Sequence, residues 1–251
     1  MTQLAIIGGT GLTQLNELNI IKRHKINTPY GSPSADFIVG ELNQIEIIFL
    51  ARHGNPHKVP PHKINYRANL WGLKQLGVDQ IIAVAAVGGI SPSMVPAHIA
   101  IPEQIIDYSY GRLHTFFEDN DYPVTHIDFT YPYSQKLRSQ LINAATEIGL
   151  PITPFGTYGC TQGPRLETAA EIKRMENDGC DVVGMTGMPE AALAKELKID
   201  YAAVSVVANW AAGKTEGEIT MVDIEHNLEA GMANVTLLLK KFISLHHSSV
   251  N

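Results

Sequence analysis

The sequence has little that would tie a protein to an oxidising compartment or a membrane. It contains two cysteines, Cys160 and Cys180, which do not form a CxxC pair, and a chain of 251 residues can fold without a disulfide. No apolar run approaches the roughly 20 residues that a membrane helix needs, and the N-terminus lacks the pattern of a signal peptide. We therefore expect a cytoplasmic protein with no membrane partner, and we assign the cysteines no chemistry.

Positive charge is also scarce. The chain carries 19 Lys and Arg residues against 25 Asp and Glu residues, a formal net charge of −6, and no segment concentrates the basic ones. Proteins that bind nucleic acid neutralise its phosphates with clustered Lys and Arg side chains. The composition therefore argues against a nucleic-acid partner.

The pattern that is present is an alternation of strand-like and helix-like segments along the whole chain. We expect strands at residues 4–7, 45–50, 80–87, 98–101, 181–183 and 201–208, and helices at 134–148, 169–178, 189–197 and about 222–243. This alternation predicts an α/β fold, a mixed β-sheet flanked by helices. No linker or change in composition divides the chain, so we expect a single domain over residues 1–251.

Several polar or small residues stand at or just after the ends of the predicted strands. They are Thr10, Arg52, His53, Ala86, Thr186 and Asn209. Ligands of α/β proteins bind beyond the carboxyl ends of the strands. We therefore expect these residues to converge in one cleft.

Two of the segments suit an anion. The turn at residues 8–11 can expose backbone N–H groups, with the Thr10 hydroxyl as a further donor. Arg52 can place two parallel N–H groups on a phosphate, and the adjacent His53 adds another donor. The sequence therefore predicts a phosphate site.

Other interpretations of these segments are weaker. A dinucleotide-binding GxGxxG counted from Gly9 fails at Gln14, and the run at residues 213–215 lacks the earlier glycine of a P-loop because Ala208 stands there. The spacing of His53, His57 and His62 matches no common metal motif. A nucleotide-sensing or dinucleotide-binding protein remains the alternative from a different class, and we expect no metal.

The run GCTQGPRLET, residues 159–168, and the strand that ends at Asn209 suggest a purine pocket. Glu167 can accept a hydrogen bond from N1–H of a 6-oxopurine, and the amide of Asn209 can both donate and accept. Adenine presents a lone pair at N1 instead, and a mismatched buried polar group costs about 1–3 kcal/mol. The alternative for Glu167 is a carboxylate that only stabilises a helix start.

Six motifs, in order along nearly the whole chain, resemble the trimeric purine nucleoside phosphorylase and methylthioadenosine phosphorylase family. They are GGTGL near the N-terminus, ARHG at 51–54, AAVGGI at 85–90, EQIIDYS at 103–109, GPRLET at 163–168 and VVGMTGMPEAALA at 182–194. The resemblance implies a nucleoside phosphorylase-like fold and a pentosyl transfer in which inorganic phosphate is a co-substrate and no cofactor is needed. It also implies a homotrimer, or a dimer of such trimers.

The resemblance further assigns roles to residues. Asn209 and Glu167 become the catalytic and base-binding pair, Leu166 and Ala211 belong to the purine pocket, and Met185 lies beneath the ribose. The phosphate pocket takes Thr10, Arg52, His53, the Ala86 backbone and Thr186. Relatives that act on methylthioadenosine have Asp at the positions of Asn209 and Ala211 and lack Glu167, so this chain departs from them.

The 5′ end of the nucleoside is expected to meet Ile224, where hydroxyl-binding relatives have a histidine, and His126 from the neighbouring subunit. A shift of two residues would place His226 there instead. With Ile224, the expected reaction is phosphate-dependent cleavage of 5′-methylthioinosine to hypoxanthine and 5-methylthioribose 1-phosphate, in purine salvage. The alternatives are a broader 6-oxopurine nucleoside phosphorylase acting on inosine and guanosine, and then a methylthioadenosine phosphorylase.

Overall fold

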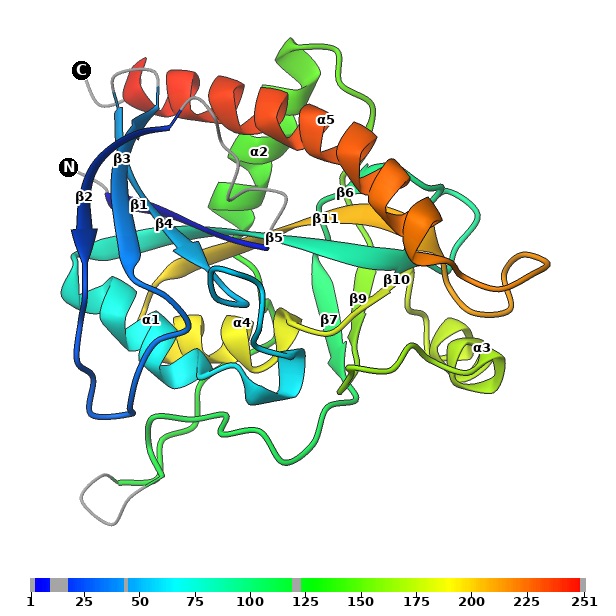
Figure 1. Cartoon of the computed structure of the whole chain (residues 1–251), viewed down its shortest axis with the longest axis horizontal. Helices are drawn as coiled ribbons and strands as arrows, with labels where there is room; N and C mark the ends of the chain where they lie inside the picture. The colour runs from blue at the N-terminus through cyan, green and yellow to red at the C-terminus, as the bar shows by residue number, and fades with distance from the viewer. Residues whose placement is uncertain (1–2, 10–17, 43–44, 119–122, 249–251) are drawn as a thin grey trace.

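Over the part of the chain that the structure describes, the fold is a single mixed sheet of eleven strands with helices on both faces (Figure 1). The computed structural model describes residues 3–9, 18–42, 45–118 and 123–248. The strands are β1 (Gln3–Gly8), β2 (Asn19–His24), β3 (Phe37–Leu42), β4 (Ile45–Ala51), β5 (Val78–Gly89), β6 (Ile99–Ala100), β7 (Gln104–Asp107), β8 (Ile152–Thr153), β9 (Thr157–Cys160), β10 (Val182–Gly184) and β11 (Asp200–Trp210). The helices are α1 (Tyr66–Gln75), α2 (Gln135–Glu147), α3 (Ala169–Asn177), α4 (Gly187–Glu196) and α5 (Met221–Ser248), with a 3₁₀ turn at Pro61–Lys63.

The centre of the sheet is parallel. β4, β1, β5 and β11 lie side by side and run in the same direction, with Ile6 of β1 opposite Phe49 and Ile82, and Ala202 of β11 also opposite Ile82. β10 pairs antiparallel with the end of β5 and continues the sheet toward β9 and β7. The carboxyl ends of the four parallel strands therefore meet at one edge of the sheet.

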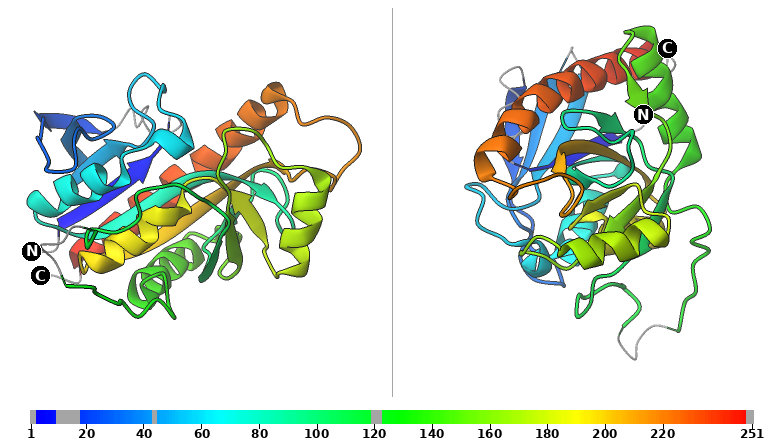
Figure 2. Two further views of the ribbon diagram at one scale, coloured as in Figure 1. Left: turned by 90° about the horizontal axis from the view of Figure 1, so that it is seen from below. Right: turned by 90° about the vertical axis from the view of Figure 1, so that its right-hand side faces the viewer.

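The helices cover two apolar faces of this sheet. α5 and α2 pack on one face and α1 and α4 on the other, as Figure 1 and the right-hand view of Figure 2 show. Successive residues of β11 alternate between the two cores: Ala202 and Val204 face α5, whereas Tyr201 and Ala203 face α4. Burial on both faces explains why β5 and β11 are almost continuously apolar.

The α/β fold class and all six predicted strands are confirmed, as are the four predicted helices. The predicted ends of those elements lie close to the observed ones, except that α5 continues to Ser248. The sequence analysis missed β2, β3, β7, β8, β9 and α1. None of the described helices is long and apolar enough to span a membrane.

Candidate active site

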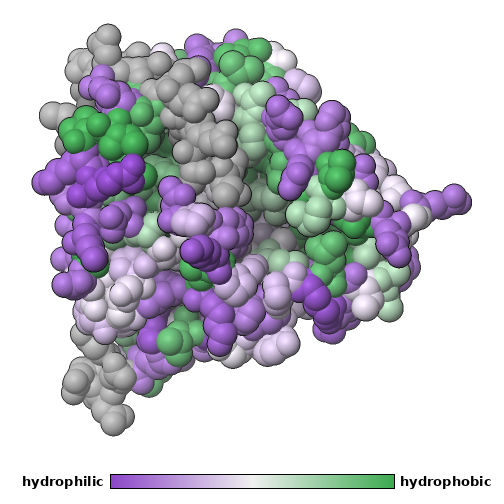
Figure 3. All heavy atoms as spheres, viewed as in Figure 1, coloured by the Kyte–Doolittle hydropathy of each residue, from purple (hydrophilic) through white to green (hydrophobic). Residues whose placement is uncertain are grey.

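A pocket of about 540 Å³ opens at the carboxyl edge of the parallel strands. It is lined by residues at or just after the ends of β1, β4, β10 and β11, by the second half of β5, by the loop before α3 and by the first turns of α5. The face of the molecule seen in Figure 3 is hollowed near its centre, and both hydrophilic and apolar residues border the hollow. The described residues that line the pocket include Gly9, Arg52, His53, Ala86, Leu166, Glu167, Met185, Thr186, Asn209, Ala211 and Ile224. The structure thus brings together nearly all of the residues predicted for the site.

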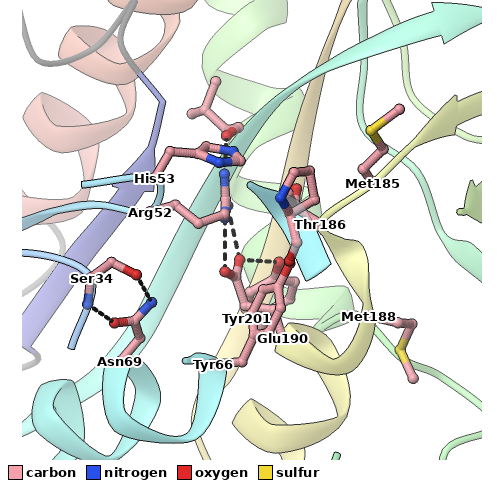
Figure 4. A network of polar contacts seen from close by, with 12 residues as sticks. Ser34, Arg52, His53, Tyr66, Asn69, Met185, Thr186, Met188, Glu190 and Tyr201 are labelled. Atoms are coloured by element: carbon pink, nitrogen blue, oxygen red, sulfur yellow. Dashed lines mark hydrogen bonds and ion pairs between the residues drawn. The ribbon is translucent and has the colours of Figure 1, made fainter. Parts of the chain in front are cut away.

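Arg52 lines the pocket just after the end of β4, but its guanidinium makes its bidentate contact with Glu190. Its Nε and Nη2 atoms donate to the two carboxylate oxygens of Glu190, each at 2.8 Å, and Nη1 donates to the carbonyl of Val84 at 2.9 Å (Figure 4). A guanidinium carries five N–H groups, so two remain that can donate to a phosphate. The bidentate contact that the sequence predicts for phosphate is made with Glu190 instead.

The Arg52–Glu190 pair is fully internal. Arg52 is 2% exposed and Glu190 is 0% exposed, and the Tyr201 hydroxyl donates to Glu190 Oε1 at 2.8 Å. Burial alone would lower the pKa of Arg52, but the charge and hydrogen bonds of Glu190 outweigh it and raise that pKa. Burial, and then the Glu190 charge, raise the pKa of Tyr201 well above its usual value. The network therefore holds Arg52 charged and its guanidinium plane fixed.

His53 is neutral and accepts rather than donates on its pocket side. Its Nδ1 lies 2.8 Å from the carbonyl oxygen of Val59, an acceptor, so Nδ1 carries the proton. Burial, followed by the charge of Arg52, lowers the pKa of His53 to about 4, and the ring stacks on His57 at 4.3 Å between centroids. The Nε2 atom then has a lone pair, which suits a protonated phosphate oxygen. The donor that the sequence predicts for His53 is not what this tautomer offers.

Ala86 of β5 and Thr186, which follows β10, both line the pocket. Ala86 is exposed and Ala85 is partly exposed in the mostly buried second half of β5, and both residues line the pocket. Thr186 is the N-cap residue of α4, yet its side chain makes no capping hydrogen bond, and its N–H lies 3.4 Å from the Tyr158 hydroxyl. Met185 precedes it and also lines the pocket. Both the Ala86 backbone and the Thr186 side chain can therefore contact a ligand.

Glu167 belongs to the pocket and not to the helix that follows it. Thr168 is the N-cap of α3, and the carboxylate that closes its capping box is Glu171. Glu167 instead accepts a hydrogen bond from Thr161 Oγ1 at 2.7 Å and lines the cavity beside Leu166. The alternative of a carboxylate that only stabilises the helix start is thus not supported.

Asn209 lines the pocket at a point where the pairing of β11 with β5 is irregular. The register between β11 and β5 shifts between Val207 and Asn209, and a bulge of this kind redirects side chains at the end of a strand. Asn209 Nδ2 donates to the carbonyl of Trp210 at 2.7 Å, which fixes the amide and leaves its second N–H for a ligand. Ala211, which is buried, follows at the base of the pocket.

The first turns of α5, with Ile219 just before the helix, give the pocket a mainly apolar wall. Ile224 lies in that wall together with Met221, Leu228 and Met232, and the charged residue Glu225 also lines the pocket there. His226 is exposed on α5 and is not among the described lining residues. Between the two alternatives for the 5′ position, the structure therefore places Ile224 at the pocket.

Two predicted residues are not seen in this pocket. Thr10 lies outside the described residues, although the preceding Gly9 lines the cavity. His126 is exposed and is not among the described residues that line the pocket of its own chain. Within the described ranges, no group of three or more His, Cys, Asp or Glu side chains is arranged to hold a metal ion.

Sequence reasoning missed several residues of the site. Glu190 lies inside the motif at 182–194, and a glutamate in such an apolar run is itself a signal of a buried ion pair. Thr161 lies within GCTQGPRLET, but its hydrogen bond to Glu167 depends on how the backbone folds between the two residues, which the sequence does not show. Ile219, Met221, Leu228 and Met232 also line the pocket, whereas the sequence predicted only Ile224 from this part of the chain.

The chain matches known proteins over nearly all of its length. The model of the phosphorylase superfamily matches residues 3–244. A probable S-methyl-5′-thioinosine phosphorylase of Pseudomonas syringae pv. tomato is 55% identical over 244 residues, covering 97% of this chain and 99% of the relative. The 6-oxopurine nucleoside phosphorylase of Pyrococcus furiosus is 45% identical over 251 residues, covering 98% and 93%.

Solved structures agree in fold. The methylthioadenosine phosphorylase of Schistosoma mansoni in complex with adenine superposes with a TM-score of 0.93 at 28% identity, covering 99% of this chain and 93% of that one. Since the family model spans most of the chain and the relatives exceed 30% identity over nearly all of it, the chain belongs to the phosphorylase superfamily and is an enzyme of the purine nucleoside phosphorylase type.

Proposed function

We propose that this enzyme cleaves S-methyl-5′-thioinosine with inorganic phosphate, giving hypoxanthine and 5-methylthioribose 1-phosphate. The observation that carries the proposal is the composition of the pocket. It combines Glu167 and Asn209, which complement a 6-oxopurine, with the apolar wall around Ile224, which complements a methylthio group. The relative named a probable S-methyl-5′-thioinosine phosphorylase supports this assignment.

In the proposed reaction, phosphate is held beside C1′ of the ribose by the free N–H groups of Arg52, the Ala86 backbone and the Thr186 hydroxyl. A phosphate oxygen forms the bond to C1′ as the bond from C1′ to the purine breaks. The sugar becomes oxocarbenium-like, so the phosphate anion also stabilises the developing positive charge. His53 Nε2 accepts a hydrogen bond from the P–OH of the nucleophile, which orients its unprotonated oxygens.

The electron pair of the broken bond enters the purine. Asn209 donates its second amide N–H to N7 or O6, where the negative charge collects, and therefore stabilises the transition state more than the substrate. Glu167 accepts from N1–H and fixes the orientation of the base. The departing purine takes up a proton and leaves as hypoxanthine.

A second candidate is a broader 6-oxopurine nucleoside phosphorylase, supported by the relative from Pyrococcus furiosus. Glu167 and Asn209 suit its substrates equally well. The apolar wall argues against it, because a 5′-hydroxyl against Ile224 would lose its hydrogen-bond partner. Methylthioadenosine is a third candidate, which Glu167 disfavours because a carboxylate would face the lone pair at N1.

We further propose that the enzyme is a cytoplasmic homotrimer, or a dimer of such trimers, that needs no metal or organic cofactor. His126 is exposed on the segment that precedes α2, which suits a residue that completes a neighbouring pocket. Light scattering on the purified protein measures the assembly. Mixing inactive Asn209→Ala and His126→Ala subunits tests whether each active site takes residues from two subunits. Activity is restored only if it does.

The central experiment is a side-by-side assay of methylthioinosine, inosine, guanosine and methylthioadenosine, each with and without phosphate. We expect base release only with phosphate, the highest kcat/KM for methylthioinosine and no effect of a chelator. Equal kcat/KM for inosine would favour the broader 6-oxopurine enzyme. Full activity without phosphate would overturn phosphorolysis altogether.

A further inference from the structure

We propose that Thr161 is a positioning residue that sets the base specificity of the pocket, by holding Glu167 as the acceptor for N1–H of a 6-oxopurine. This inference rests on the proposed function, because it concerns the same base-binding site. Thr161 does not line the main pocket itself. It lies behind Glu167, in a small hollow to which Glu167 also contributes.

The direction of the hydrogen bond follows from the geometry. Thr161 Oγ1 lies 2.7 Å from Glu167 Oε1 and 3.3 Å from the carbonyl oxygen of Gly184. A hydroxyl has a single proton to donate. The Gly184 carbonyl already accepts the Thr161 N–H at 2.8 Å, so the shorter contact to Glu167 takes the hydroxyl proton.

Arg112 holds the backbone at Thr161. Thr161 is 8% exposed, and Arg112 Nη2 donates to the carbonyls of Thr161 and Gln162, each at 2.9 Å. Arg112 Nη1 donates to the carbonyl of Met185, also at 2.9 Å. The same side chain therefore ties the segment before Glu167 to the segment that carries Met185 at the other side of the pocket.

The consequence concerns the second carboxylate oxygen. Within the described residues, Thr161 makes the one hydrogen bond to Glu167, which holds Oε1 and leaves Oε2 to the ligand. An aligned Oε2 favours the N1–H of a 6-oxopurine and repels the N1 lone pair of an adenine. If the Thr161 hydroxyl is removed, the Glu167 carboxylate can rotate away. This rotation weakens the hydrogen bond to N1–H of a 6-oxopurine and relieves the repulsion of the N1 lone pair of an adenine.

The matched variants are Thr161→Val, which keeps the branched shape and removes the hydroxyl, and Thr161→Ser, which keeps the hydroxyl. We expect Thr161→Val to lower kcat/KM for methylthioinosine by about tenfold, to leave that for methylthioadenosine unchanged or raised, and to leave the KM for phosphate unchanged. Thr161→Ser is expected to retain the wild-type ratio of the two substrates within about threefold. A Thr161→Val enzyme with the wild-type ratio, or with both substrates lowered alike, would overturn the inference.

Binding of the free bases separates this inference from the proposed function. Calorimetry with hypoxanthine and adenine needs no turnover, and we expect the wild-type preference for hypoxanthine to shrink by about tenfold in Thr161→Val and to survive in Thr161→Ser. If the wild-type protein shows this preference and Thr161→Val loses it, but the wild-type protein does not phosphorolyse methylthioinosine, the function is wrong and the role of Thr161 stands. If wild-type phosphorolysis is normal and Thr161→Val keeps the preference, the role of Thr161 is wrong and the function stands.

Discussion

Arg52 and Glu190 form a bidentate ion pair beneath the pocket, with both donor–acceptor distances at 2.8 Å and both side chains buried. The two residues are 138 positions apart, one after the strand β4 and the other in the helix α4. Removing one partner of such a pair leaves an uncompensated buried charge, whereas removing both does not. The pair therefore offers a way to separate the stability of the fold from the binding of phosphate.

The first prediction uses this separation. Arg52→Met is expected to lower the free energy of unfolding by about 3–5 kcal/mol, because Glu190 loses its counter-charge. The double variant Arg52→Met with Glu190→Leu is expected to recover most of that loss and still show a KM for phosphate raised at least tenfold. Chemical denaturation and phosphate kinetics on both variants measure the two effects. A double variant with the wild-type KM for phosphate would mean that Arg52 serves only the fold.

The second prediction concerns acid stability. His53 has a pKa lowered to about 4 in the folded protein, by burial and then by Arg52, against 6.5 when unfolded. Between these values the unfolded chain binds more protons than the folded one, so the stabilisation is complete above pH 6.5 and is lost as the pH falls toward 4. The full loss from this group is about 3 kcal/mol. His53→Asn, which keeps a side-chain donor, is expected to flatten this part of the pH dependence measured by urea unfolding, and an unchanged slope would contradict the burial of a neutral imidazole.

The third prediction addresses base recognition at Asn209. Asn209→Asp is expected to reduce the ratio of methylthioinosine to methylthioadenosine kcat/KM by about five- to tenfold, because a carboxylic acid can share a proton with N7 while it faces a 6-amino group. The switch stays incomplete while Glu167 opposes adenine N1. The variant also loses the donor to the Trp210 carbonyl, so a modest drop in melting temperature accompanies it. An unaltered substrate ratio would show that Asn209 does not read the base.

The central fold and most of the pocket could be predicted because their signals are local. β5 and β11 are long apolar runs, and polar residues that follow such runs meet at one edge of a parallel sheet. The elements that were missed lack such signals. β2 is exposed along most of its length, with Ile20 and Ile21 both at the surface, so it shows no apolar alternation. β8 has two residues, too few for an apolar alternation to show.

The helix α1 and the contacts of the site were hidden for a different reason, which is that they depend on distant residues. Gly72 interrupts the helical pattern of α1, yet it is required because a Cβ there would lie 2.3 Å from the Phe37 ring of β3. Glu190 likewise has its role only beside Arg52, and the tautomer of His53 depends on the carbonyl of Val59. Such pairings are set by the folded backbone and leave no periodic trace in the sequence.

The last prediction concerns the apolar wall and is the sharpest test of the substrate. Ile224 lines the pocket, whereas His226, two residues further along α5, is exposed and is not among the described lining residues. We expect methylthioinosine to exceed inosine in kcat/KM by roughly 10- to 200-fold, since the methylthio group gains apolar contact while a 5′-hydroxyl would lose a hydrogen-bond partner. Ile224→His is expected to reduce or reverse this preference, because an imidazole can bond the hydroxyl and interrupts the apolar wall.

His226→Ala is the matched control for that variant, since it changes a histidine on the same helix without altering the wall, and it is expected to keep the wild-type ratio. Both ratios come from kcat/KM measured with methylthioinosine and inosine at saturating phosphate. If Ile224→His keeps the preference and His226→Ala loses it, the first turns of α5 present the opposite face to the substrate. If the wild-type enzyme uses the two substrates equally, the apolar wall does not meet the 5′ group, and the broader 6-oxopurine activity becomes the better account of the pocket.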